Sequence, residues 1–124
     1  MPGDHLYLSA QAPLPITVES VSDAVRRRWP GIKVYTSGED GNREVGFFAP
    51  VNGWDVDCTF YEGQRFMTVD LGEEGASVGE WFLRQAPEDV SWVVFTEQET
   101  DGVPVSSRAS ARELLDAVHW PRRT

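Results

Sequence analysis

The sequence has little sulfur, few basic residues and no long apolar run. It contains one cysteine, which excludes an intramolecular disulfide and any multi-cysteine metal site. Only 11 basic residues stand against 20 acidic ones, and the net charge of −9 argues against a sequence-independent nucleic-acid binder, which needs a basic footprint. No apolar run could span a membrane, and no basic, apolar leader follows Met1. We therefore expect a soluble cytoplasmic protein that binds neither nucleic acid nor membrane.

The common catalytic signatures are also missing. The sequence contains no Walker loop, G-x-G-x-x-G, H-E-x-x-H, G-x-S-x-G or paired C-x-x-C. We assign no catalytic residue, no metal ligand and no cofactor, and the balance favours a binding protein over an enzyme. The sequence does contain many large apolar side chains that could fill a core, with five Trp and six Phe in 124 residues. A chain of this length buries ~65–70% of its unfolded surface, so residues 1–124 are expected to form one domain.

Residues 44–71 predict three antiparallel strands joined by two tight turns. Asn52-Gly53 is a strong signal for a two-residue hairpin turn, because both central residues of a type I′ turn need positive φ. Side chains alternate along a strand, so this turn brings apolar residues together on one face. The pairs are Val51 with Trp54, Ala49 with Val56, Phe47 with Cys58 and Val45 with Phe60.

The second turn is predicted at Glu62-Gly63, although Glu is poorly suited to positive φ. A two-residue loop there pairs Asp55 with Asp70 on the face opposite the apolar one. Neighbouring carboxylates cost up to about 1 kcal/mol, which the inward apolar residues outweigh. The same register pairs Met67 with Cys58, Val69 with Val56 and Leu71 with Trp54.

The rest of the chain predicts three more strands and three helices. Strands are expected at residues 6–11, 32–36 and 92–96. The last is expected to be covered on both sides or to lie centrally in the sheet, because WVVF is nearly continuously apolar. Thr17 is expected to cap a helix that ends at Pro30-Gly31. Capping boxes are expected to start the other two helices. Ser77 and Glu80 start a helix that runs through about Ala86, and Ser110 and Glu113 start a last helix that Pro121 closes. Residues 98–105 are expected to form a loop.

The elements add up to an α+β fold in the order β-α-β-β-β-β-α-β-α. We expect a mainly antiparallel sheet of about six strands with the helices packed on one face. The opposite face of the meander would then stay at least partly open, unless a loop or the last helix covers it. That face carries the candidate partner-binding residues: Phe48, Asp55, Asp57, Tyr61, Phe66 and Asp70.

Exposed rings bordered by acids are typical of a protein interface, and the charge favours a basic protein partner. An ordinary solvated strand face is the plain alternative. A second hypothesis is a small-molecule or metal-dependent enzyme that uses Asp55, Asp57 and Asp70 in a cavity on the sheet face. A third is a homodimer through two open faces, although two acidic faces repel. The sequence leaves monomer and homodimer open.

Other reactive residues have structural interpretations. The register points Cys58 into the core beside Phe47, where a thiolate is disfavoured. His5 lies near the start of the chain and His119 at the end of the last helix, and nothing in the sequence holds either beside Cys58 or the aspartates. The only basic run, residues 26–28, is expected near a helix C-terminus, where positive charge is favoured anyway.

The opening LYLSAQAPLPITVESVSDAV, followed by an acidic, Trp-rich α+β body, resembles small bacterial immunity proteins of polymorphic-toxin systems. The likeness covers the layout of most of the chain and includes no diagnostic motif. It implies stoichiometric binding and neutralisation of a toxin domain, and it assigns no functional residue.

Overall fold

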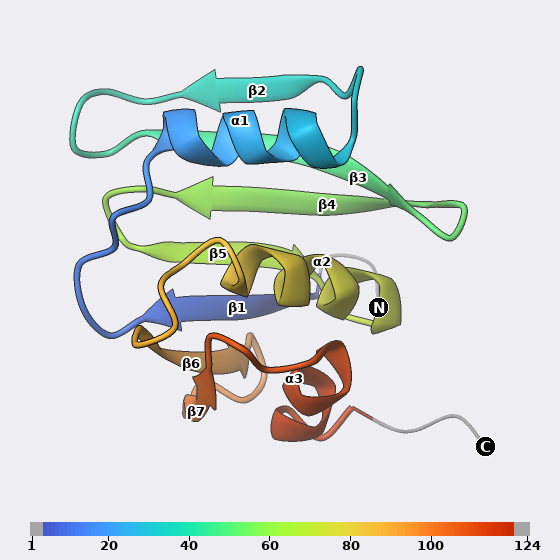
Figure 1. Cartoon of the computed structure of the whole chain (residues 1–124). Coiled ribbons are helices and arrows are strands. Elements are labelled where there is room, and N and C mark those ends of the chain that lie inside the picture. Colours follow the sequence, from blue (N-terminus) through green and yellow to red (C-terminus); the bar gives the residue numbers. More distant parts are fainter. Residues whose placement is uncertain (1–3, 121–124) are drawn as a thin grey trace.

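The structure is a computed structural model, and it describes residues 4–120. Its seven strands form one antiparallel sheet in the order β2-β3-β4-β5-β1-β6-β7 (Figure 1). None of the described helices is long and apolar enough to cross a membrane. The elements are β1 (His5–Ala10), α1 (Val18–Arg28), β2 (Val34–Ser37), β3 (Glu44–Val51), β4 (Trp54–Tyr61), β5 (Phe66–Asp70), α2 (Glu73–Leu83), β6 (Ser91–Thr96), β7 (Val103–Ser106) and α3 (Ala111–Ala117).

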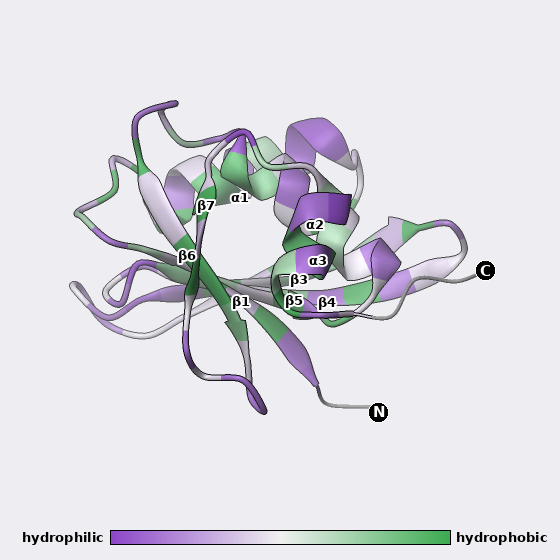
Figure 2. Cartoon of the chain, turned by 90° about the horizontal axis from the view of Figure 1, so that it is seen from below, coloured by the Kyte–Doolittle hydropathy of each residue, from purple (hydrophilic) through white to green (hydrophobic). Residues whose placement is uncertain are grey.

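All three helices pack on the same face of the sheet, as predicted. Figures 1 and 2 show α1 over the β3 and β4 side, α2 across the middle, and α3 beside α2 at the β6 end. Gly79 on α2 lies so close to Leu8, Val69 and Leu114 that an added Cβ would be 3.1–3.9 Å from their methyl groups. The sheet and both C-terminal helices therefore share one core.

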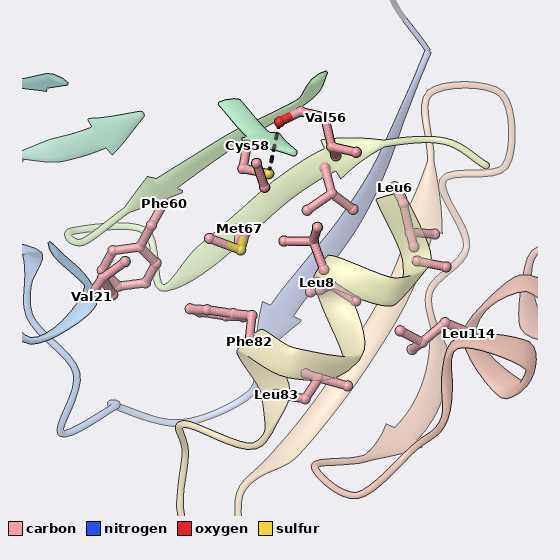
Figure 3. Packing of buried hydrophobic residues seen from close by; sticks show 14 of the residues in the cluster. Leu6, Leu8, Val21, Val56, Cys58, Phe60, Met67, Phe82, Leu83 and Leu114 are labelled. Atoms are coloured by element: carbon pink, nitrogen blue, oxygen red, sulfur yellow. Dashed lines mark hydrogen bonds between the residues drawn. The ribbon is translucent and has the colours of Figure 1, made fainter. Parts of the chain in front are cut away.

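The core lies between these two layers (Figure 3). Leu6, Leu8, Met67 and Phe82 are fully buried there, and Phe60 is 1% exposed. Full burial of one such side chain contributes about 1.5–3 kcal/mol, so the apolar face of the sheet holds the helices in place.

The β3–β4 hairpin has the predicted register. Asn52 and Gly53 adopt φ of 50° and 82°, as a type I′ turn requires. Val51 pairs with Trp54, and the pairing continues without a shift to Glu44 and Tyr61.

The predicted register between β4 and β5 is wrong by two residues. Cys58 lies opposite Val69 and Phe60 opposite Met67, because residues 62–65 form a four-residue connection. In that connection the residue with positive φ is Arg65, at 57°, rather than Glu62. Glu62 accepts a hydrogen bond from the Val18 amide at the start of α1 (2.7 Å). A shift of two keeps every side chain on its predicted face.

Two of the three predicted helix starts are correct. Thr17 caps α1 and Ser110 caps α3, the latter in the predicted capping box with Glu113. Helix α2 instead begins four residues before Ser77, directly after Gly72. Gly75 allows this early start, because a Cβ there would lie 1.6 Å from the Asp70 carbonyl oxygen. Ser77 is an exposed residue inside the helix.

The end of the chain contains a strand that was not predicted. Residues 103–106 form β7 at the sheet edge, where a loop was expected. Strand β6 is second from that edge and alternates between faces: Trp92 and Val94 are buried under the helices, whereas Val93 and Phe95 are half-buried on the other side. Strand β6 is therefore an interior strand of the sheet, between β1 and β7, and its apolar residues are fully buried only on the helix side.

Trp54 is the main error in the predicted core. It has the side-chain parity of the buried face, yet 66% of it is exposed. Strand β5 ends at Asp70, so the tip of the β3–β4 hairpin extends past the helices (Figure 1). Val56, two residues further along β4, is under α2 and only 2% exposed.

Candidate functional site

The open face, defined here as the side of the sheet opposite the helices, carries a band of four aromatic rings. The aromatic band crosses four neighbouring strands through Tyr61 on β4, Phe66 on β5, Tyr7 on β1 and Phe95 on β6. Successive ring centroids are 4.5, 5.9 and 4.8 Å apart, and the first and last pairs are stacked. Stacked rings restrict one another, so the band is a rigid surface. Its side chains would lose little conformational entropy when a partner binds. All four residues are half-buried.

One carboxylate anchors the β1 end of this face. Glu97 accepts hydrogen bonds from the His5 amide (2.8 Å) and from the Tyr7 hydroxyl (3.2 Å), and it lies 2.9 Å from His5 Nδ1. Partial burial acts to raise the pKa of Glu97, but the hydrogen bonds from His5, from its own backbone and from Tyr7 together outweigh burial, and the net pKa is lowered. Burial, together with the charge of Glu97, raises the pKa of Tyr7. The carboxylate is therefore charged, and the phenol neutral, at pH 7.

A polar row lies beside the aromatic band. His5 on β1 pairs directly with Asp70 on β5, and the amide of Asp57 on β4 donates to Asp70 Oδ2 (2.9 Å). This arrangement corrects two expectations. The neighbour of Asp70 is Asp57 rather than Asp55, because of the two-residue shift between β4 and β5. His5, in turn, is held beside the aspartates, because β1 inserts between β5 and β6.

The polar row includes the described residues best placed to hold a metal ion. One ligand atom each from His5, Asp57 and Asp70 lie within 4.8 Å of one another. Because Glu97 occupies Nδ1 of His5, Nε2 is the ring nitrogen left to ligate, and a carboxylate on the other nitrogen is the usual support of a ligating histidine. One nitrogen and two carboxylate oxygens suit zinc or manganese, with positions left for water.

The strands of this face carry no lysine or arginine that would neutralise its carboxylates. None of the seven described strands contains lysine or arginine. Arg43, the basic residue just before β3, is already paired with Glu19 and Glu62. Excess negative charge on an aromatic surface favours a cationic partner.

The six predicted site residues all have the parity of the open face, and the structure separates them into three groups. Tyr61 and Phe66 belong to the aromatic band, and Asp57 and Asp70 to the polar row. Phe48, on β3, is 52% exposed and pairs with Asp57. Asp55 is exposed at the hairpin tip, away from the band.

The lone thiol contributes nothing to this face. Cys58 is fully buried on the helix side, where its Sγ lies 3.3 Å from the Val56 carbonyl oxygen (Figure 3). Burial raises the pKa of the Cys58 thiol far above its usual range, so the nucleophilic thiolate is not populated. The predicted structural role of Cys58 is confirmed.

Three members of the open face escaped the sequence analysis: Tyr7, Phe95 and Glu97. Tyr7 alternates with Leu6 and Leu8, and that alternation alone predicts that its ring points away from the core. The contact between Tyr7 and Phe95 could not be found in the same way, because no local signal places β1 next to β6.

Comparisons of this chain with protein-family models, with curated proteins and with solved structures found no match. The resemblance to immunity proteins therefore stays a prediction.

Proposed function

We propose that this protein is a non-catalytic binding domain whose open face docks a basic protein partner. The observation that carries the proposal is the aromatic band, lying beside Asp57, Asp70 and Glu97 on a face that no described helix covers. Aromatic anchors surrounded by polar groups are the usual energetic centre of protein interfaces. The acidic charge of the chain complements a basic partner.

In its sharpest form the protein is an immunity protein that neutralises a toxin domain in the cytoplasm. The resemblance of the sequence layout supports this form, as does the absence of the common catalytic signatures from the sequence. A toxin domain that acts on nucleic acid would need a basic surface, which an acidic surface would complement. Co-purification with the product of a neighbouring toxin-like gene, in a 1:1 ratio, is the expected result.

Charge reversal on the open face tests the proposal. Asp55→Lys/Asp57→Lys is expected to weaken capture of the identified partner at least about tenfold, because each close interfacial charge pair is worth about 1.5 kcal/mol or more. Both residues are incompletely buried, so the melting temperature should change little. The control is Glu88→Lys/Asp89→Lys, which makes the same charge change in the exposed loop after α2.

Equal affinity of the open-face variant and the wild type would contradict the proposal. Light scattering on the free protein tests the other occupant, a second copy of this chain. A mass of two chains that reverts to one in Phe48→Ala or Tyr61→Ala would assign the open face to a homodimer instead.

The polar row supports a second candidate, a metal-dependent function that uses His5, Asp57 and Asp70. Zinc or manganese should then raise the melting temperature, since a ligand that binds only the folded state stabilises it. The His5→Ala variant should lose that shift. A shift that persists in His5→Ala, or no shift with either ion, would discard the metal site and leave the protein-binding proposal unaffected.

A further inference from the structure

A small pocket opens beside the open face, where β5 ends and α2 begins. Its volume is about 250 Å³, and the residues that line it include Trp54 and Trp120 and four acidic residues, Asp55, Asp70, Glu73 and Glu74. No lysine, arginine or histidine lines it. We call it the two-tryptophan pocket.

The four acidic residues around the pocket have no basic partner among the described residues. Within residues 4–120, Asp55, Glu73 and Glu74 form no ion pair, and the contact of Asp70 is with the Asp57 amide. Glu73 and Glu74 lie in the first turn of α2, where the helix dipole favours acids for purely structural reasons. The dipole does not account for Asp55, which belongs to β4.

The tryptophans point independently to a ligand. Trp54 is 66% exposed and stacks on no other ring within the described part of the chain. Trp120 is held at the pocket by backbone geometry: its amide donates to Leu115 (2.9 Å), and His119 takes φ of 58°, which is the turn that ends α3. The large apolar ring of Trp54 is therefore left in water, and Trp120 lines the same pocket.

Indole faces and carboxylates together select one chemistry. The face of tryptophan carries negative potential and attracts ammonium or guanidinium groups. The volume is below the roughly 300–1,000 Å³ of pockets that enclose drug-sized ligands, so the pocket suits one side chain rather than a whole metabolite. Asp55 and Asp70 also belong to the rim of the open face.

We infer that the two-tryptophan pocket receives one arginine or lysine side chain of the basic partner that docks on the open face. The inference rests on the proposed function for the identity of the partner. The guanidinium or ammonium group lies against Trp54 and Trp120, and the carboxylates neutralise its charge. The pocket would thus fix the position of the partner along the face.

The test titrates small probes into the ¹⁵N-labelled full chain and follows the tryptophan indole N–H signals by NMR. The probe is N-acetyl-arginine methylamide, and its neutral isostere, N-acetyl-citrulline methylamide, is the control. Trp54 and Trp120 are assigned from Trp54→Phe and Trp120→Phe. We expect the arginine probe to shift both signals with saturation at millimolar concentration, and the citrulline probe to bind at least about tenfold more weakly.

Two pairs of substitutions locate the binding. Asp55→Asn/Glu74→Gln should weaken the arginine probe several-fold, whereas Glu88→Gln/Asp89→Asn, with the same change in net charge, should not. The inference is overturned if both probes bind equally, or if saturating arginine probe leaves the Trp54 signal in place.

Two further outcomes separate this inference from its premise. The sequence after Trp120 contains Arg122 and Arg123, so the titration is repeated on Arg122→Gln/Arg123→Gln. Unchanged affinity is expected, and a large gain would assign the pocket to the chain's own terminus rather than to a partner. If the probe fails while Asp57→Lys still abolishes partner capture, the pocket inference falls and the proposed function stands. If the arginine probe binds while Asp57→Lys leaves partner capture unchanged, the proposed docking face falls and the pocket stands as a site for a cationic side chain.

Discussion

Phe47 and Phe48 are adjacent phenylalanines on β3 whose side chains point to opposite faces of the sheet. Phe47 is 1% exposed and packs near Trp29 and Trp81, with ring centroids 6.0 and 6.5 Å away. Phe48 is 52% exposed on the open face. Replacing each with alanine removes the same atoms from the same strand, so the two variants test the assignment of the faces directly.

The expected losses differ several-fold. Phe47→Ala leaves a cavity among aromatic rings, and such substitutions cost about 3–5 kcal/mol. Phe48→Ala leaves no cavity, and the lower β-propensity of alanine costs up to about 1 kcal/mol. Stability for a domain of this length is about 6–19 kcal/mol, so both variants should still fold at 25 °C unless the wild type lies near the lower limit.

Thermal and urea unfolding measure the difference. The unfolding entropy of a 124-residue domain is about 0.26 kcal/mol/K, so each kcal/mol lowers the melting temperature by about 4 °C. We expect Phe47→Ala to melt about 12–19 °C below the wild type and Phe48→Ala within about 4 °C of it. Partner affinity should show the reverse order, with Phe48→Ala the weaker binder. Equal losses of stability in the two variants would refute the face assignment on which the binding proposal depends.

Three further predictions concern single residues. Hydrogen bonds lower the pKa of Glu97 in the folded state, so the folded protein binds fewer protons at this carboxylate than the unfolded chain. The stability that Glu97 contributes is complete above its unfolded-state pKa of about 4.3, and it is lost as the pH falls through its folded-state pKa. Urea midpoints of Glu97→Gln should therefore lie below the wild type at pH 7 and converge with it toward pH 2, and a gap independent of pH would contradict this. The buried Cys58 thiol should resist iodoacetamide in the native state and react in urea, so rapid native labelling would disprove its burial. His119→Gly should gain about 0.5–1 kcal/mol by relieving a left-handed residue after α3, whereas His119→Ala, which keeps a Cβ, should not.

Local patterns were enough to predict much of the fold. Asn52-Gly53 specified the β3–β4 hairpin to the residue, and the two capping residues Thr17 and Ser110 located the starts of α1 and α3. The parity of the six candidate residues was also correct, because a turn that fixes one pair fixes the face of every residue in the strand.

Two errors concerned contacts that the turn and capping patterns did not include, one distant in the sequence and one local. In the four-residue β4–β5 connection, Glu62 accepts a hydrogen bond from the start of α1, a contact 44 positions away in the sequence. Helix α2 begins early because Gly75 lets it pack directly on the end of β5. Neither the turn pattern at residues 62–63 nor the capping pattern at Ser77 indicated these contacts.

The sequence by itself determined the acidic charge, the apolar and polar alternation of the strands, and therefore which residues lie on each face. Alternation is a property of the extended backbone and needs no partner. Only the tertiary structure decided that β1 inserts between β5 and β6, which joins Tyr7 and Phe95 to the aromatic band and brings His5 beside Asp70. Strand order depends on the packing of the helices over the whole sheet. Local patterns therefore fix the face on which each site residue lies, and long-range contacts bring these residues together.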